Sequence, residues 1–226
     1  MEIRKILEVL KELNFKTLYF NFRYLPLKYA IRLPFFISRH VYLSETLGSV
    51  TIEGPIRTRQ IRIGYKAVGI FDHKRSRSVW QVAGLVIFKG HASIGHGSKI
   101  SVGKTGILIL GDHFKVSAES SIIATGGTVE FGSGCLLSWD ILIMNSDFHK
   151  IYNNDMNLIN PPDDITIGDN VWIGCRCLVL KGAEIANNNI IAAGSIVNKG
   201  SRMDSENTIY GGHPIKELRS GVSWEM

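Results

Sequence analysis

Aliphatic residues recur at every sixth position in the C-terminal half of the chain. One unbroken series consists of Ile167, Ile173, Val179, Ile185, Ile191 and Val197. Four positions after the first five of these stand mostly small residues, namely Val171, Cys177, Ala183, Asn189 and Ser195. Shorter series with the same spacing lie upstream, in residues 82–100, 110–122 and 131–143. A period of six fits neither an α-helix nor the simple alternation of a half-buried strand.

We interpret this spacing as a coil of flat faces, in which each face is one short strand and one corner. The aliphatic residue would point inward and stack on its equivalent in the next turn, and the small residue would fit the corner. Hexapeptide repeats are a signature of the parallel β-helix. Three faces give about 18 residues per turn and roughly six coils. We therefore predict an all-β parallel β-helix over residues 49–212, with irregular turns near 104–109 and 126–130; a β-sandwich is the alternative.

The six-residue phase is lost after Ile143 and returns at Ile165. Within this gap, residues 150–164 are polar and contain Pro161 and Pro162 among several Asn residues. This composition is typical of a loop, and we expect an excursion of about one coil. Long loops that leave a regular scaffold often carry function.

The N-terminal segment, residues 1–48, differs from the repeats in charge and aromatic content. Residues 1–80 contain 15 Lys/Arg and 6 Asp/Glu, whereas the rest of the chain contains 11 and 14. The pattern predicts a short helix over 2–13, and Pro26 and Pro34 argue against one long helix. Two interpretations stay open: a segment that packs on the main body, or a peripheral contact with a membrane surface. A nucleic-acid surface is not expected.

The composition limits the class of protein. A chain of 226 residues with 45% hydrophobic residues is expected to fold around one sizeable core. It has no apolar run long enough for a membrane span and no secretory stretch at its start. Three Cys residues form neither a disulfide framework nor a paired zinc motif. We expect a cytoplasmic protein, peripheral at the inner face of the membrane if the N-terminal segment binds it, with a C-terminal tail over 213–226.

Three local motifs stand in the repeat frame. Residues 167–174 read Ile-Gly-Asp-Asn-Val-Trp-Ile-Gly, residues 145–149 read Asn-Ser-Asp-Phe-His, and residues 211–216 read Gly-Gly-His-Pro-Ile-Lys. Together with the repeats and the loop, they resemble the hexapeptide-repeat acyltransferases, in particular the maltose and galactoside acetyltransferases and the O-acetyltransferases of capsular and exopolysaccharide clusters. The resemblance implies a left-handed β-helix that transfers an acetyl group from acetyl-CoA to a hydroxyl of a sugar or polysaccharide precursor.

The resemblance also places the chemistry. A hydroxyl is a poor nucleophile near pH 7, so a base must take its proton, and histidine suits this task with an unperturbed pKa of ~6.5. The family's catalytic histidine corresponds to His149. In an extended chain Asp147 would share a face with His149 and orient its imidazole. The resemblance implies that the backbone N–H of Cys175 donates a hydrogen bond to the oxyanion. It also implies direct transfer in a ternary complex, without an acyl-enzyme.

Binding residues are carried over in the same way. The implied contacts of acetyl-CoA are Trp172, Cys175, Ala193, Asn198, Lys199, Lys216 and Arg219. The three basic side chains suit anionic phosphates, although each alone is more typical of an ordinary surface charge. On the acceptor side we expect Ser117, Trp139 and Asn145. No metal is expected, and the resemblance implies a homotrimer with each site between two subunits.

Two other functions stay open. The acceptor would be an amino-sugar nitrogen rather than a hydroxyl in an N-acetyltransferase. A zinc enzyme of the carbonic anhydrase type uses the same scaffold, but His91, His96, His113 and His149 show no tight ligand spacing along the sequence. The identity of the acceptor and the use of acyl groups other than acetyl are not decided by the residues.

Overall fold

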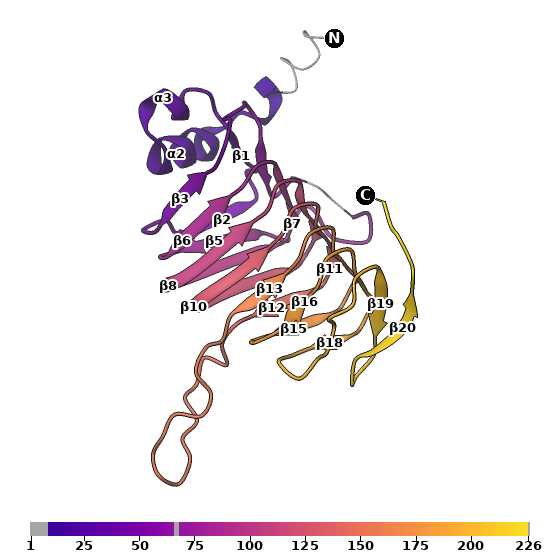
Figure 1. Cartoon of the computed structure of the whole chain (residues 1–226). Coiled ribbons are helices and arrows are strands. Elements are labelled where there is room, and N and C mark those ends of the chain that lie inside the picture. Colours follow the sequence, from indigo (N-terminus) through magenta and orange to yellow (C-terminus); the bar gives the residue numbers. More distant parts are fainter. Residues whose placement is uncertain (1–8, 66–67, 226) are drawn as a thin grey trace.

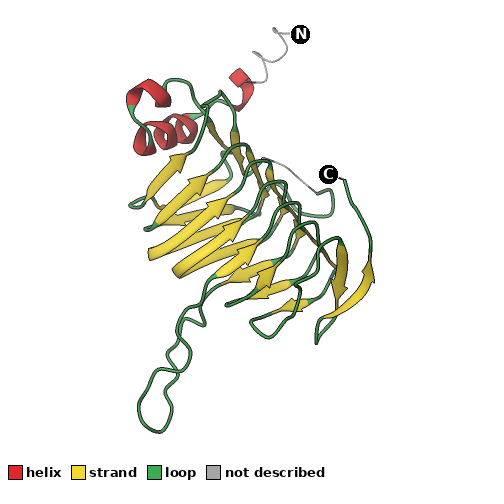
Figure 2. Ribbon diagram, viewed as in Figure 1, coloured by secondary structure: helices red, strands yellow, loops and turns green. Residues whose placement is uncertain are grey.

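The chain winds into a three-faced solenoid of mostly parallel strands (Figure 1). The structure is a computed structural model that describes residues 9–65 and 68–225. Most regular structure in these residues is strand, and the described helices lie at the N-terminal end of the solenoid (Figure 2). The predicted all-β class with parallel sheets is confirmed.

Most coils contribute a strand to each of the three faces, and the antiparallel strand β20 of the tail completes the first face. The first face is a sheet in the order β1 (Phe35–Ile37), β4 (Ile61–Ile63), β7 (Ala92–His96), β9 (Phe114–Ala118), β11 (Leu136–Trp139), β14 (Trp172–Ile173), β17 (Ile190–Ile191), β19 (Thr208–Gly211) and β20 (Lys216–Ser220). The second face contains β2 (Val41–Glu45), β5 (Ser78–Val82), β8 (Lys99–Leu110), β10 (Ser121–Phe131), β12 (Leu142–Met144), β15 (Leu178–Leu180) and β18 (Ile196–Val197). The third face contains β3 (Ser49–Ile52), β6 (Leu85–Phe88), the second halves of β8 and β10, β13 (Ile165–Ile167) and β16 (Glu184–Ile185).

The six-residue series forms the core. Ile173 pairs with Ile191, Val179 with Val197, and Ile167 with Ile185, so that residues 18 positions apart lie in neighbouring coils. All six aliphatic side chains of this series are buried, and so are the five small residues at the corners. The predicted inward ladder and the 18-residue coil are therefore confirmed for this part of the chain.

The upstream coils are longer. Ile94 pairs with Val116, which lies 22 residues later, and the register of β8 and β10 shifts between Ala124 and Gly126. This shift lies at one of the expected irregular turns. Parallel pairing already begins at β1, so the solenoid starts before the boundary that the sequence suggested at residue 49. Buried aromatic residues such as Phe35 fill this end, which is why no six-residue aliphatic series marked it.

A short helical cap closes the N-terminal end of the solenoid. It consists of α2 (Phe15–Tyr24) and α3 (Leu27–Ala30), and the break between them falls at Pro26 as expected. Phe20 is fully buried, and its ring contacts the ring of Trp80 edge-on at 5.1 Å. The side chain of Asn21 bonds both backbone groups of Phe35. The N-terminal segment therefore packs on the main body. The helix predicted over 2–13 lies partly outside the described residues, of which 9–12 are helical.

The predicted loop is an arm that projects from the solenoid between β12 and β13 (Figure 1). The outgoing and returning halves of the arm are joined by an isolated antiparallel bridge between Tyr152 and Leu158. The arm exposes an unusual number of large apolar side chains for a polar segment: Phe148, Ile151, Tyr152, Met156, Leu158 and Ile159. Within the described residues, no helix has the length and hydropathy to cross a membrane.

Candidate active site

His149 lies at the foot of the arm, where the chain has just left the second face of the solenoid. Its side chain is exposed, and no described residue forms a hydrogen bond with its imidazole ring. The backbone N–H of His149 donates to the carbonyl oxygen of Asp147 at 2.7 Å, and Phe148 between them adopts a left-handed φ of 63°. The imidazole is therefore free to contact a molecule from outside.

The carboxylate of Asp147 has other partners than the one we expected. Its Oδ2 accepts hydrogen bonds from Nζ of Lys181 at 2.5 Å and from Nδ2 of Asn160 at 3.0 Å. These bonds, that of Lys181 first, hold the pKa of Asp147 below its usual value. The turn at Phe148 abolishes the extended geometry that would have put the two side chains on one face, so an Asp147–imidazole contact is not found among the described residues.

Two ion pairs fasten the arm to the solenoid. Lys181 binds Asp147 at the start of the arm, and Lys199 binds Asp163 at its end, with Nζ–Oδ2 distances of 2.5 and 2.7 Å. The two lysines are 18 residues apart and thus lie on neighbouring coils. The sequence interpretation missed Lys181 and Asn160, although the coil period already placed Lys181 next to Lys199. Lys199, expected at the cofactor phosphates, is here shared with the arm.

Cys175 lies at the corner between β14 and β15. No described residue accepts a hydrogen bond from its backbone N–H, while its carbonyl oxygen accepts from Gly194 at 2.9 Å. Ala193 occupies the equivalent corner of the next coil and is exposed. Burial raises the pKa of the neighbouring Cys177 thiol, which is in the core as expected. The corner thus offers a free amide donor beside a small side chain.

Trp172 and the tail line the same side of the solenoid. The indole N–H of Trp172 donates to Ser138 Oγ at 3.1 Å, and its ring lies 5.9 Å from that of Trp224. The sequence interpretation did not assign Ser138 to the site, and it missed Trp224 because no repeat marks the tail. Lys216 and Arg219 are exposed on β20, and Asn198 is exposed in a turn after β18.

The expected acceptor residues divide into two groups. Asn145 is fully buried, and its amide bonds the backbone N–H of Thr125 at 2.9 Å and the carbonyl oxygen of Gly126 at 2.6 Å. It joins two coils at the foot of the arm, so a role in direct acceptor binding does not fit its place. Ser117 and Trp139 are half-buried on β9 and β11, and Trp139 pairs with Ala118.

The structure does not bring His149 and Cys175 together within one chain. β12 and β15 are parallel neighbours, with Leu142 opposite Leu178. His149 follows the end of β12, whereas Cys175 precedes the start of β15. The candidate base and the candidate oxyanion donor therefore lie at opposite ends of the strands of the second face.

The comparisons with known proteins agree with the coil geometry. A family model described as bacterial transferase hexapeptide, with six repeats, matches residues 164–199. The chain carries a transferase hexapeptide repeat. The matched segment includes β13 to β18, the part of the solenoid with 18-residue coils, and it begins where the arm ends. The resemblance stated from the motifs is confirmed to this extent.

Individual proteins resemble this chain over stretches of different length. A putative acetyltransferase of Saccharomyces cerevisiae is 46% identical over 55 residues, which are 24% of this chain and 26% of the yeast protein. The polysialic acid O-acetyltransferase of Neisseria meningitidis is 38% identical over 61 residues, 26% of this chain and 28% of that protein. An uncharacterized 24.8 kDa protein in the cps region of Klebsiella pneumoniae is 27% identical over 157 residues, 68% of each chain. The aligned segments thus span about a quarter of the yeast and Neisseria proteins.

The ion pair between Lys181 and Asp147 allows a prediction about the pKa of Asp147. Lys181→Gln is expected to raise the pKa of Asp147 toward the ordinary value of ~3.9, as followed by an NMR titration of the carboxyl carbon. Because the folded-state pKa is depressed, the stabilising contribution is present above the ordinary pKa and is lost as the pH falls through the folded value. Asp147 is largely exposed, so the effect on global stability should be small.

Lys199→Gln is the matched control, since it removes the equivalent lysine one coil away. It should raise the pKa of Asp163 and leave that of Asp147 nearly unchanged. An Asp147 titration midpoint that is identical in the wild-type protein and in Lys181→Gln would show that this ion pair does not hold the arm.

Proposed function

We propose that this chain is an acetyl-CoA-dependent O-acetyltransferase that acts on a hydroxyl of a sugar or polysaccharide precursor. The observation that carries the proposal is the exposed imidazole of His149, which bonds no other described residue, at the foot of an arm next to a repeat segment that matches a bacterial transferase family model. The names of the Neisseria and yeast relatives support an acetyl donor, and the former supports a saccharide acceptor. We take the solenoid to be left-handed, as the resemblance implies.

The reaction would proceed by direct transfer. The imidazole of His149 takes the proton from the acceptor hydroxyl as its oxygen attacks the thioester carbonyl carbon. The carbonyl oxygen becomes an oxyanion and accepts a hydrogen bond from the backbone N–H of Cys175, which has no other described acceptor. The C–S bond then breaks, the imidazolium returns the proton to the departing sulfur, and the acetyl ester and free CoA leave.

Acetyl-CoA would lie along the corner that begins at Cys175. The exposed methyl group of Ala193 leaves room for the pantetheine chain beside the free amide. The exposed side chains of Lys216 and Arg219 on β20 provide positive charge for the nucleotide phosphates, and Asn198 provides an amide. Lys199 is the weaker candidate, because Asp163 already neutralises it.

We further propose that the protein is a homotrimer with each site between two copies. His149 and Cys175 lie at opposite ends of the strands of the second face, so one chain alone does not present both to the same acyl group. The arm next to His149 carries several exposed apolar side chains, which a neighbouring chain would cover. A second copy would supply the missing half of the site.

His149→Ala should lower turnover by about 10²–10⁴-fold and leave the affinity for acetyl-CoA unchanged, because general-base catalysis contributes that much to the chemical step alone. Thiol release measures turnover, and calorimetry measures acetyl-CoA binding. His149→Asn should be nearly as inactive. His40→Ala, which removes another exposed histidine, is the control and should stay active. A His149→Ala protein that keeps most of its turnover would end the assignment.

Mixing two inactive variants tests the shared site. We expect Ala193→Trp to block the acyl pocket without disturbing the core, since Ala193 is exposed. In randomly mixed trimers of Ala193→Trp and His149→Ala chains, roughly a quarter of the sites would combine an intact His149 with an intact Ala193. Coexpressed chains should thus recover a measurable part of wild-type turnover, while each variant alone does not. No recovery in verified mixed trimers would place both residues of a site on the same chain.

We also propose that the cap rests on an anionic membrane surface, at the cytoplasmic face. One side of α2 exposes Phe15, Leu18, Tyr19 and Phe22, which follow the spacing of a single helical face. Residues 1–80 carry nine more basic than acidic residues. A basic segment with exposed aromatic side chains suits the boundary between acyl chains and anionic headgroups.

Exposed residues allow this contact to be removed without loss of the core. The Phe15→Ser/Phe22→Ser double variant should float poorly with phosphatidylglycerol-containing vesicles, whereas the wild-type protein floats with them. Ile70→Ser, at an exposed apolar position outside the cap and the arm, is the control and should float like the wild type. Equal flotation of the double variant and the wild type, or equal binding to purely zwitterionic vesicles, would contradict the proposal.

A further inference from the structure

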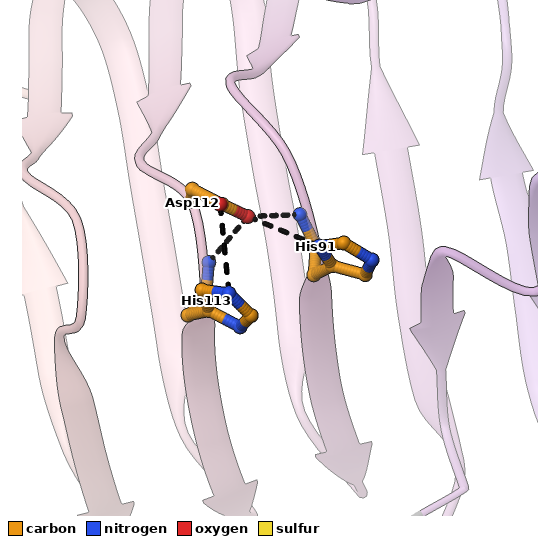
Figure 3. Close-up of side chains that lie close together, drawn as sticks. All are labelled: His91, Asp112 and His113. Atoms are coloured by element: carbon orange, nitrogen blue, oxygen red, sulfur yellow. Dashed lines mark hydrogen bonds and ion pairs between the residues drawn. The ribbon is translucent and has the colours of Figure 1, made fainter. Parts of the chain in front are cut away.

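Two histidines and one aspartate meet at a corner of the solenoid that the proposed reaction does not use (Figure 3). His91 and His113 immediately precede β7 and β9, whose residues Ala92 and Phe114 are paired. Their spacing of 22 residues looked too wide for a metal site in the sequence, but it equals one coil. The two rings therefore lie nearly parallel, with centroids 5.0 Å apart and an interplanar angle of 9°.

Asp112 lies beside the two stacked rings (Figure 3). Its Oδ1 accepts hydrogen bonds from the backbone N–H of His91 at 2.6 Å and of His113 at 2.9 Å, and it is 3.3 Å from Nδ1 of His91. Its Oδ2 is 3.6 Å from Nε2 of His113. The two backbone hydrogen bonds thus hold the carboxylate in a fixed position.

The backbone is shaped to admit this carboxylate. A Cβ atom at Gly90 would overlap the side chain of Asp112, so only glycine leaves the necessary space. The solenoid does not need histidine at these corners. His113 has a left-handed φ of 59°, and Asn170 and Asn188 adopt the same conformation at the equivalent position of later coils.

A later corner shows which part of the arrangement is structural. Oδ1 of Asp169 accepts from the backbone N–H of Ser133 in the preceding coil, as Oδ1 of Asp112 does from that of His91. In that later coil the next residue is Asn170 instead of a histidine. The Asp–backbone bond therefore belongs to the fold, whereas Oδ2 of Asp112 and the two imidazoles are additional to it.

We propose that His91, Asp112 and His113 bind a zinc ion that links two neighbouring coils. Two imidazole nitrogens and one carboxylate oxygen are a donor set that suits Zn²⁺, with water completing a tetrahedral site. The three ligand atoms lie within 4.8 Å of one another. Zinc–ligand distances of about 2.0–2.2 Å require ligand atoms roughly 3.4 Å apart, so the partly exposed side chains need to move closer by up to about 1.4 Å.

The neighbouring lysine does not occupy the carboxylate of Asp112, which can therefore bind a metal ion. Lys89, which lies next to this corner, is paired with Glu130 at 2.9 Å rather than with Asp112. The site is also separate from the proposed catalytic residues: His91 and His113 precede strands of the first face, whereas His149 follows a strand of the second. The zinc ion would act as a clip between coils, without a part in acyl transfer.

The test is a calorimetric titration of Zn²⁺ into the metal-free full-length protein, with the visible spectrum of the Co²⁺-loaded protein as a report of tetrahedral geometry. We expect one zinc ion per chain. His113→Asn, which keeps a residue that tolerates the left-handed turn, should lower zinc affinity by at least about tenfold. A free zinc concentration about a hundredfold above the Kd should raise the melting temperature of the wild type by roughly 5–10 °C.

His73→Asn is the matched control. The rings of His73 and His96 are also stacked, with centroids 5.0 Å apart. Among the described residues, however, no third metal-binding side chain groups with this pair as Asp112 does with His91 and His113. The control variant should bind zinc as the wild type does. The proposal is overturned if the wild type binds no zinc, if His113→Asn and the His91→Asn/His113→Asn double variant bind it undiminished, or if His73→Asn loses as much affinity as His113→Asn.

Discussion

The stacking of one buried aliphatic side chain on its equivalent in the next coil is the constraint on which this structure depends. Where Ile173 lies over Ile191 and Val179 over Val197, the strands are parallel and in register, and the corners recur at the same positions of each coil. Burial of such a ladder keeps each coil dependent on its neighbours. It also brings together residues that are one coil apart in sequence, as it does for His91 and His113 and for Lys181 and Lys199.

The arm is the place where this constraint is interrupted. Between β12 and β13 the chain leaves the ladder, and two ion pairs from neighbouring coils, Lys181–Asp147 and Lys199–Asp163, fasten its two ends. This attachment keeps the exposed imidazole of His149 at a defined place beside a regular scaffold. The free N–H of Cys175 lies at another corner, so the geometry of a single coil stack favours a site completed by a second copy.

The sequence was informative where a period governs the structure. Six-residue spacing predicted the ladder, the small corner residues and the arm, all of which depend on side-chain size at fixed intervals. It did not predict the early start of the solenoid, because Phe35 and other aromatic residues fill that end. The partners of Asp147 depend on the left-handed turn at Phe148, and the burial of Asn145 depends on bonds to another coil. Neither is encoded in local spacing.

The most direct test is a crystal structure of the protein with bound acetyl-CoA, in which two distances are measured. The account predicts that the thioester carbonyl oxygen lies within hydrogen-bonding distance of the backbone N–H of Cys175. It also predicts that the imidazole nearest the thioester belongs to His149 of a neighbouring copy. A thioester bound away from Cys175, or one approached by no His149 of any copy, would contradict the account.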